Sequence, residues 1–458
     1  MIRILSRVGA LALVLGAMTA QAQGADDHDQ TLIERGAYLA RAGDCVACHT
    51  APDGDDFAGG LAIESPFGAI YSTNITPDPD AGIGRYSEAE FAAALRKGQR
   101  ADGANLYPAM PYPSYARLTD DDIHALYVYF MQGVAPNDHQ PQQTDLSFPF
   151  NQRWGISAWN WLFADQTPFE PNAQDSDRVN RGRYLVEGLG HCGSCHTPRG
   201  IFQQEKALGD DGGDDYLAGA NLNGWLAPEL RGGGEDHLGV AGWTTRDIVD
   251  YLATGRNAHS AVTGEMTSVI DNSTSHMTRE DLSAIAAYLK TLQVSDSTDI
   301  GSERRVSEQK TDQTEQQLRD ATALDEGARL YLDNCNACHF ADGRGASGVF
   351  PALAGNSQVN ADNPTGLLHT MLAGAQLPST SERPEALMMP GFGWRLSDKE
   401  MADLATFVRQ GWGNQGSPVT PEEVKKVRSS MDAREGFSGN PEATGANHPD
   451  DRAGASAQ

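Results

Sequence analysis

Three short motifs in the chain place two cysteines and a histidine at a spacing that suits cofactor chemistry. They read CVACH, CGSCH and CNACH, and together they use all six cysteines of the sequence. Two thiols three residues apart occupy one helical turn, where each can form a thioether with a haem vinyl group while the next residue ligates the iron. The motifs predict three covalently bound haem c groups, attached through Cys45, Cys48, Cys192, Cys195, Cys335 and Cys338 and ligated by His49, His196 and His339.

Other uses of paired cysteines match this pattern less well. A tetrahedral zinc site normally takes two cysteine pairs, or one pair and two further spaced ligands, for each ion. A redox-active dithiol or a disulfide needs no histidine after the second cysteine. Because the chain has only 12 histidines, one directly after every pair favours haem attachment.

A second axial ligand is expected after each motif, and methionine is the common partner of histidine in electron-transfer cytochromes. After the first motif, Met110 of LYPAMPYPSY is the only methionine before the next predicted helix. After the third, Met389 of ALMMPGFGW precedes a proline, as Met110 does. We therefore predict Met110 and Met389 as ligands, ahead of Met388 and Met371.

The region after the second motif offers several candidate ligands. Met266 lies twelve residues before the next predicted helix, whereas Met277 lies directly beside the start of that helix. A ligand needs a loop long enough to cross the haem edge, so Met266 is the prediction. His259 is the alternative, because imidazole also binds metals.

The segments that flank the motifs are repeated as well, which indicates three repeated domains. Upstream, a glycine eight to ten residues before each first cysteine is followed by a leucine at helical spacing, so each motif is predicted to follow a short amphipathic helix. Downstream, a capped helix with one apolar face is predicted to begin at Thr119, Thr278 and Ser397. The aromatic residue ten positions later in each helix should pack on the helix that precedes the haem.

We expect an all-α fold of three tandem class-I-like cytochrome c domains joined by irregular linkers. The length of 458 residues agrees with ~150 residues per domain. The tryptophans of the connector, Trp154, Trp159 and Trp161, serve either packing between the first two domains or contact with a partner subunit or the membrane interface. The expected divisions are a signal peptide at 1–22, cytochrome c domains at 30–135, 179–293 and 321–416, a Trp-rich connector at 136–178, a polar linker at 294–320, and a polar, disordered tail at 417–458 with a short helix at 420–432.

The first residues and the overall charge bear on where the protein works. Arg3 and Arg7 precede an apolar run, and the segment AQA ending at Ala22 matches a cleavage site, so we expect a secretory signal peptide. No later stretch reaches ~18 consecutive apolar residues, the length that a membrane-spanning helix needs. The net charge of −27 argues against nucleic acid as a partner.

These features resemble the triheme cytochrome c subunits of bacterial membrane-associated dehydrogenases, of the quinoprotein alcohol dehydrogenase and flavoprotein gluconate dehydrogenase types. The resemblance runs from about Gly36 to Asn414 and is dense in YLARAGDCVACHTAP, PFGAIYSTNITPDPDAGIGRYSEAEF, LYPAMPYPSYARLTDDD, HCGSCHTPRG and LATFVRQGWGN. It implies that electrons pass from a catalytic dehydrogenase subunit through three haems to ubiquinone. It also implies a periplasmic location on the outer face of the cytoplasmic membrane, and it makes Met110, Met266 and Met389 the matching methionines.

Three alternatives stay open at this point. In the first, the partner is a molybdenum hydroxylase-type aldehyde dehydrogenase. In the second, the chain is itself a peroxidase-like haem enzyme with one open iron site. In the third, it is a haem-based sensor or storage protein. A candidate methionine after every motif argues against an open iron site. No extra signalling domain is recognisable, so we predict no catalytic residue in this chain and electron transfer as its role.

Overall fold

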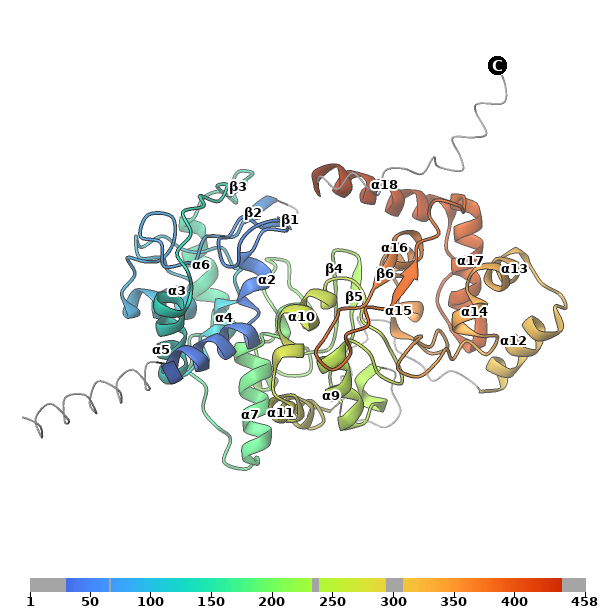
Figure 1. Ribbon diagram of the computed structural model, residues 1–458, viewed down its shortest axis with the longest axis horizontal. Coiled ribbons are helices and arrows are strands. Elements are labelled where there is room, and N and C mark those ends of the chain that lie inside the picture. Colours follow the sequence, from blue (N-terminus) through green and yellow to red (C-terminus); the bar gives the residue numbers. More distant parts are fainter. Residues whose placement is uncertain (1–29, 66, 233–238, 294–307, 439–458) are drawn as a thin grey trace, which may run out of the picture. The chain divides into compact units, whose positions relative to one another are not determined.

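The computed structural model describes residues 30–65, 67–232, 239–293 and 308–438, which form two compact units (Figure 1). The first unit holds the described residues up to Glu170 together with Gly188–Gly190. The second holds Pro171–Glu187 and the described residues from His191 onward. The predicted signal peptide, residues 294–307 of the predicted linker and residues 439–458 of the predicted tail lie outside the described residues.

The first unit contains the first motif and residues 136–170 of the Trp-rich connector. A helix at 30–42 leads into the motif, which is itself helical. Three short strands form one antiparallel sheet in the order β1-β2-β3. The elements are α2 Cys45–His49, β1 Ala62–Ser65, β2 Gly68–Tyr71, α3 Glu88–Lys97, α4 Tyr112–Tyr115, α5 Asp120–Val128, η1 Tyr129–Gly133, β3 Asp145–Leu146 and α6 Trp154–Phe163.

The second unit contains the second and third motifs. Its strands form two antiparallel pairs, β4 with β5 and β6 with β7. The elements around the second motif are α7 Asp177–Arg183, η2 Tyr184–Leu189, α8 Gly193–His196, η3 Asp210–Gly212, β4 Ala220–Leu222, β5 Trp225–Ala227, η4 Gly239–Gly242, α9 Thr245–Thr254, α10 Met266–Asn272, η5 Thr274–His276 and α11 Arg279–Leu289. Those around the third motif are α12 Glu308–Asp320, α13 Glu326–Asn334, α14 Asn336–His339, α15 Ser357–Asn360, α16 Thr365–Ala373, β6 Gly374–Gln376, β7 Met388–Pro390, α17 Asp398–Gln410, η6 Gly411–Gly413 and α18 Pro421–Ser438.

The same helix crossing is built three times around a glycine. A Cβ on Gly36 would lie 2.1 Å from the carbonyl oxygen of Ala125 in α5, and one on Gly182 would lie 1.9 Å from that of Ala284 in α11. At Gly327 of α13 the corresponding distance, to Asp403 in α17, is 2.4 Å. Only a residue without a side chain lets the two backbones come so close.

Next to each crossing lies the aromatic residue predicted for it. The nearest side-chain carbons to the three glycines include the Cβ atoms of Tyr129, Tyr288 and Phe407. The predicted packing of the last helix on the helix that precedes each motif is therefore confirmed. α7 and α11 lie side by side in Figure 1, as do α13 and α17.

The predicted caps of the last helices are also confirmed. The side chains of Thr119, Thr278 and Ser397 each accept a hydrogen bond from the backbone N–H three residues on. At Ser397 the capping box is complete, because the Glu400 carboxylate also accepts from the backbone N–H of Ser397 at 2.9 Å. These local bonds satisfy N–H groups that a helix start otherwise leaves without partners.

The fold is mostly helical, but it differs from the all-α expectation by three small antiparallel sheets. Residues 308–320, predicted as part of a polar linker, form α12, in which Leu318 is buried in the core around α13 and α17. The short helix expected at 420–432 is present as α18 and is longer. Within the described residues, we find no helix that is both long and apolar enough to cross a membrane.

Candidate haem-binding sites

All three motif histidines are held by a backbone carbonyl. The Nδ1 atom of His49 lies 2.6 Å from the oxygen of Thr73, that of His196 lies 2.7 Å from Pro228, and that of His339 lies 3.0 Å from Pro351. A carbonyl only accepts, so Nδ1 carries the proton and donates. Nε2 is then left as the unprotonated nitrogen that can bind a metal, and the ring is fixed in orientation.

The surroundings keep these imidazoles neutral. Burial lowers the pKa of His49, His196 and His339, and the hydrogen bonds to the carbonyls oppose this effect only in part. A ligand to iron must be the neutral imidazole, because a protonated ring has no free lone pair. The local environment therefore favours the form that ligation requires.

The first cysteine of each pair is half-buried, whereas Cys48 and Cys195 are exposed. Burial raises the pKa of Cys45, Cys192 and Cys335 to about 12. These thiols are therefore protonated and poor nucleophiles near neutral pH, unlike the acidic thiols of dithiol redox enzymes. The low intrinsic reactivity agrees with a structural attachment role rather than with thiol–disulfide exchange.

The first predicted methionine lies in a turn tied to its motif. The N–H of Met110 donates to Tyr107, and its carbonyl accepts from Tyr112 at the start of α4. From the same helix the Tyr115 hydroxyl donates to the carbonyl of Gly43, two residues before Cys45. Met110 thus stands on the segment that α4 anchors beside the first motif.

After the third motif the two adjacent methionines lie in different environments. In β7, Met389 pairs in register with Ala375 of β6 and packs partly buried against the core around α13, α16 and α17. The side chain of Met388 is 72% exposed, and Met371 is buried within that same core. This arrangement agrees with the choice of Met389, although axial ligation itself stays a prediction.

The candidates after the second motif are separated in a similar way. Met266 is the first residue of α10 and packs against the cluster of Val262, Ile270 and Leu377. The alternative, His259, has its Nε2 3.4 Å from the Asp247 carboxylate and its ring stacked on Trp243. Met277 directly precedes the cap of α11. His259 is thus engaged elsewhere, and Met266 stays the predicted ligand.

The carbonyls that orient the histidines were not found from the sequence. Their spacings from the histidines are 24, 32 and 12 residues. No fixed interval links them to the motif, and one acceptor is a threonine where the other two are prolines. A backbone acceptor leaves no residue-type signal, so only the folded chain reveals it.

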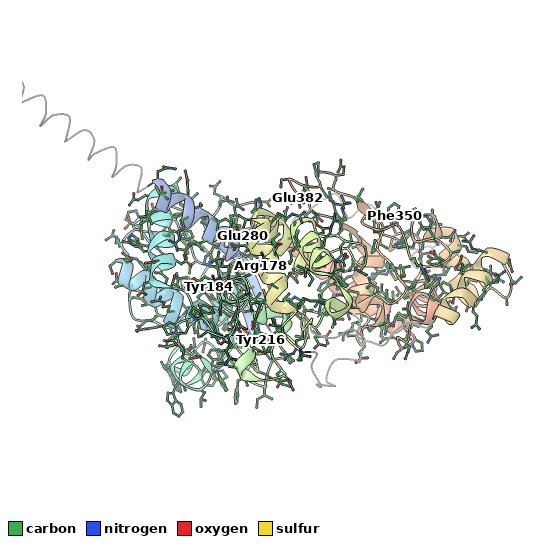
Figure 2. All side chains as sticks on the ribbon, turned by 90° about the horizontal axis from the view of Figure 1, so that it is seen from below. Arg178, Tyr184, Tyr216, Glu280, Phe350 and Glu382 are labelled. Carbon is green, nitrogen blue, oxygen red and sulfur yellow. The ribbon has the colours of Figure 1, made fainter. Side chains whose placement is uncertain are left out.

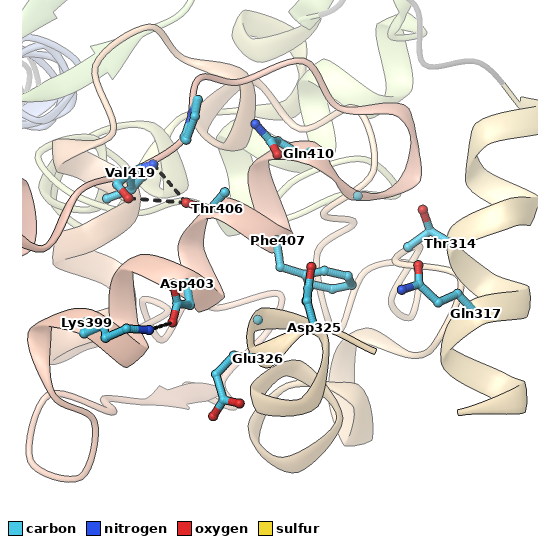
Figure 3. A pocket seen from close by; sticks show the side chains of 13 residues that line it. Thr314, Gln317, Asp325, Glu326, Lys399, Asp403, Thr406, Phe407, Gln410 and Val419 are labelled. Atoms are coloured by element: carbon cyan, nitrogen blue, oxygen red, sulfur yellow. Dashed lines mark hydrogen bonds and ion pairs between the residues drawn. The ribbon is translucent and has the colours of Figure 1, made fainter. Parts of the chain in front are cut away.

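A cavity of about 620 Å³ opens between α12, α13 and α17 (Figure 3). Lys399 and Asp403 form an ion pair at its edge, and the Thr406 hydroxyl exchanges hydrogen bonds with the backbone of Val419. None of the twelve predicted haem residues lines it. This cavity is therefore separate from the predicted cofactor sites.

The residues present fit a haem c at each motif. Each has two thiols on one turn, a neutral imidazole with a free Nε2, and a methionine farther along the chain, in a turn for Met110, at the start of α10 for Met266 and in β7 for Met389. With a histidine and a methionine as ligands, a haem iron at such a site would exchange single electrons and offer no open position to a substrate. The donor set therefore suits electron transfer rather than catalysis.

Comparison with known proteins gives similarities along most of the chain. The family model described as cytochrome c matches residues 33–133 and 324–412. The chain is 46% identical over 432 residues to the cytochrome c subunit of alcohol dehydrogenase (quinone) from Gluconobacter oxydans, covering 93% of this chain and 87% of that protein. It is 46% identical to the gluconate 2-dehydrogenase cytochrome c subunit of Pantoea cypripedii, with 91% and 94% covered, and 39% identical to the fructose dehydrogenase cytochrome subunit of Gluconobacter japonicus, with 87% and 82% covered.

Proposed function

The chain belongs to the family of cytochrome c subunits of membrane dehydrogenases, and we propose that it carries electrons from a partner dehydrogenase towards ubiquinone or another respiratory acceptor. The relatives are named as subunits of dehydrogenases for alcohol, gluconate and fructose. The substrate is bound by the catalytic subunit in this proposal. This chain supplies three one-electron carriers and no catalytic residue.

The proposed carriers are three haem c groups, one in each of the domains 30–135, 179–293 and 321–416. The observation that carries this proposal is the threefold Nδ1–carbonyl hydrogen bond, which presents Nε2 of each motif histidine to a metal. Met110, Met266 and Met389 complete the proposed axial pairs. Each haem would supply reversible one-electron chemistry at iron, while the protein sets ligand geometry and excludes water.

We further propose that the mature protein lies in the periplasm, peripheral on the cytoplasmic membrane. Support comes from α6, which has no charged side chain between Trp154 and Phe163 and exposes Trp154, Trp161 and Leu162. Trp159, by contrast, packs on Tyr112 and Phe163. Exposed tryptophans on an uncharged helix suit the headgroup region of a bilayer.

Two measurements test the function. Mass spectrometry of the mature protein should find three added haems, and a count of two would remove one motif from the proposal. Co-purification from the native membrane should bring down a dehydrogenase subunit that reduces this protein when its substrate is added. Capture of a molybdenum enzyme instead would favour the alternative partner, and a high-spin haem with peroxidase activity would favour the haem-enzyme alternative.

The membrane proposal has its own test in binding to phosphatidylcholine vesicles. The double substitution Trp154→Ser and Trp161→Ser should reduce co-sedimentation several-fold. Trp394→Ser serves as the control, because Trp394 is also exposed but lies before α17. Equal binding of wild type and the double variant would contradict a role of α6 at the membrane.

A further inference from the structure

A buried arginine in the second unit lacks the partners that its charge requires. Arg256 follows Gly255 at the end of α9, and its side chain is only 5% exposed. Its Nη2 donates one long hydrogen bond, of 3.5 Å, to the carbonyl of Glu385. Among the described residues, its Nε and Nη1 have no hydrogen-bond partner. A guanidinium has five N–H donors, so most of its hydrogen-bonding capacity is unused.

Such an arrangement is costly unless a missing anion completes it. A buried charge without a paired and hydrogen-bonded counter-ion is among the most unfavourable features of a folded protein. Arg231, also in the second unit, shows the usual solution. It is equally buried, but it donates to the carbonyls of Tyr216 and Gln293 and has Asp210 and Asp214 within 4 Å. Among the described residues, Arg256 has no acidic side chain within ion-pair distance. Two charged neighbours act on it from farther away and in opposite directions: burial and the Arg383 guanidinium lower its pKa, whereas the Glu385 carboxylate raises it.

The position of Arg256 relates it to the proposed haem sites. It stands on the loop between α9 and Met266 and pairs with Ala261 in an isolated bridge. The next residue, Asn257, accepts at its carbonyl a hydrogen bond from Gly348, in the loop that leads to Pro351. Pro351 is the residue that holds His339. Arg256 therefore lies where the loops of the second and third predicted haem sites meet.

Arg383 adds a second positive charge to this junction. Its Nη1 donates to the carbonyl of Gly348 at 3.0 Å, and its segment leads to Met389. Two guanidinium groups close together repel each other unless an anion lies between or beside them. The pair thus marks a place for a carboxylate or another oxyanion, which arginine binds in bidentate geometry.

We propose that Arg256 binds a propionate carboxylate of the haem attached to Cys192 and Cys195. This inference rests on the proposed haem content and adds the residue that holds the anionic edge of the second haem. A free oxyanion such as phosphate offers the same chemistry from solvent. The propionate is favoured because Arg256 lies on the loop that carries the predicted ligand Met266, and because the Arg256 side chain is itself buried.

The test compares Arg256→Gln and Arg256→Lys with Arg246→Gln in the haem-loaded protein. Arg246 is a matched control, since it lies on the same helix, α9, and its side chain is 89% exposed. The potentials of the haems are titrated by absorbance between pH 5 and 9. Arg256→Gln should lower one of them, because loss of a buried cation stabilises the oxidised iron, and should make that potential pH-dependent. Arg246→Gln should change none.

The affected haem is identified with Met266→His, which should shift the same component. Met389→His should shift the potential of the third haem. If Arg256→Gln alters only that potential, the assignment of Arg256 to the second haem is overturned. Unaltered potentials and pH profiles in Arg256→Gln would overturn the proposal altogether. If Arg256→Gln does not fold, resonance Raman spectra of Arg256→Lys replace it, and an unchanged propionate bending mode counts against the proposal.

Two further arms separate the competing explanations. Titrations with and without phosphate test whether a solvent anion binds Arg256 instead. If phosphate shifts a potential of the wild type and this shift is absent in Arg256→Gln, the ligand of Arg256 is phosphate and not the propionate. Haem counting by mass is independent of these readouts. A wild type without haem on Cys192 and Cys195 would refute the haem content on which this inference rests, whereas three haems with unaltered potentials would refute only the role of Arg256.

Discussion

Each motif histidine is oriented by a hydrogen bond from its Nδ1 to a main-chain carbonyl oxygen. Because every residue has such an oxygen, this hydrogen bond does not require a particular residue type. Thr73 occupies the role that Pro228 and Pro351 have at the other two sites. A side-chain substitution at these acceptors leaves the oxygen in place if the loop keeps its path. The ligand geometry therefore depends on loop conformation, and the sequence constrains it only indirectly.

The two neighbouring methionines of β7 provide a direct test of axial ligation. Met389→Leu should remove the sulfur from the third iron, weaken the methionine–iron charge-transfer band of the oxidised protein and turn one haem high-spin. Met388→Leu is the matched control and should leave the spectrum unaltered, because the Met388 side chain is exposed. Optical and magnetic circular dichroism spectra of both variants measure the difference. A reversed result would move the ligand to Met388.

Asp44, directly before the first cysteine, should make stability depend on pH. Burial raises its pKa from 3.8 to about 8, against the opposing charge of Arg41, and its Oδ1 has no hydrogen-bond partner within the described residues. The folded state thus holds a proton that the unfolded state releases above about pH 4. The free energy of unfolding should fall as pH rises from about 4 to about 8.

Urea unfolding of the Asp44→Asn variant measures this contribution. The amide cannot ionise, so the variant should lose that part of the pH slope and be more stable than wild type at pH 8. Asp53→Asn is the control, because Asp53 is exposed and no such gain is expected. Parallel slopes for wild type and Asp44→Asn would contradict the raised pKa.

At the scale of elements, the glycine crossings fix how the helix before each motif meets the last helix of its repeat. Gly182→Ala would place a methyl group 1.9 Å from the Ala284 carbonyl oxygen, so α7 and α11 must move apart. We expect a loss of about 1–3 kcal/mol in the free energy of unfolding. Gly155→Ala in α6 meets no atom within 4 Å and should stabilise by up to ~1 kcal/mol. Denaturant titrations of both variants measure the contrast.

The elements predicted from the sequence are those whose signals are local. The caps at Thr119, Thr278 and Ser397 depend on bonds across three residues, and the apolar faces repeat at helical spacing. The strand pairs were missed because they are short and formed by loops, as where Ala375 meets Met389. α12 was missed because its sequence is polar and its helix packs through few residues, of which Leu318 is buried.

At the scale of the whole molecule, the second and third repeats share one compact unit, which the sequence did not indicate. Trp225 of β5 stacks on His369 of α16, and a Cβ on Gly264 or Gly366 would lie within 3 Å of its ring. Arg279 forms an ion pair with Glu382, which is labelled in Figure 2. The contacts of Trp225 with His369 and Gly366, and of Arg279 with Glu382, join residues 100 or more apart, a separation at which no periodicity or motif carries information.

This junction should make the second and third repeats unfold together. Trp225→Ala removes the ring that α16 and the Gly264 turn enclose, at a cost of about 3 kcal/mol, the low end for a tryptophan because Trp225 is only half-buried. Thermal unfolding of the haem-loaded wild type should show one transition for these two repeats, and the variant should split it into two. Trp394→Ala, which removes an exposed tryptophan, should keep one transition. Two transitions already present in the wild type would mean that the contacts around Trp225 do not couple the repeats, and that each haem domain is stabilised by its own helix crossing alone.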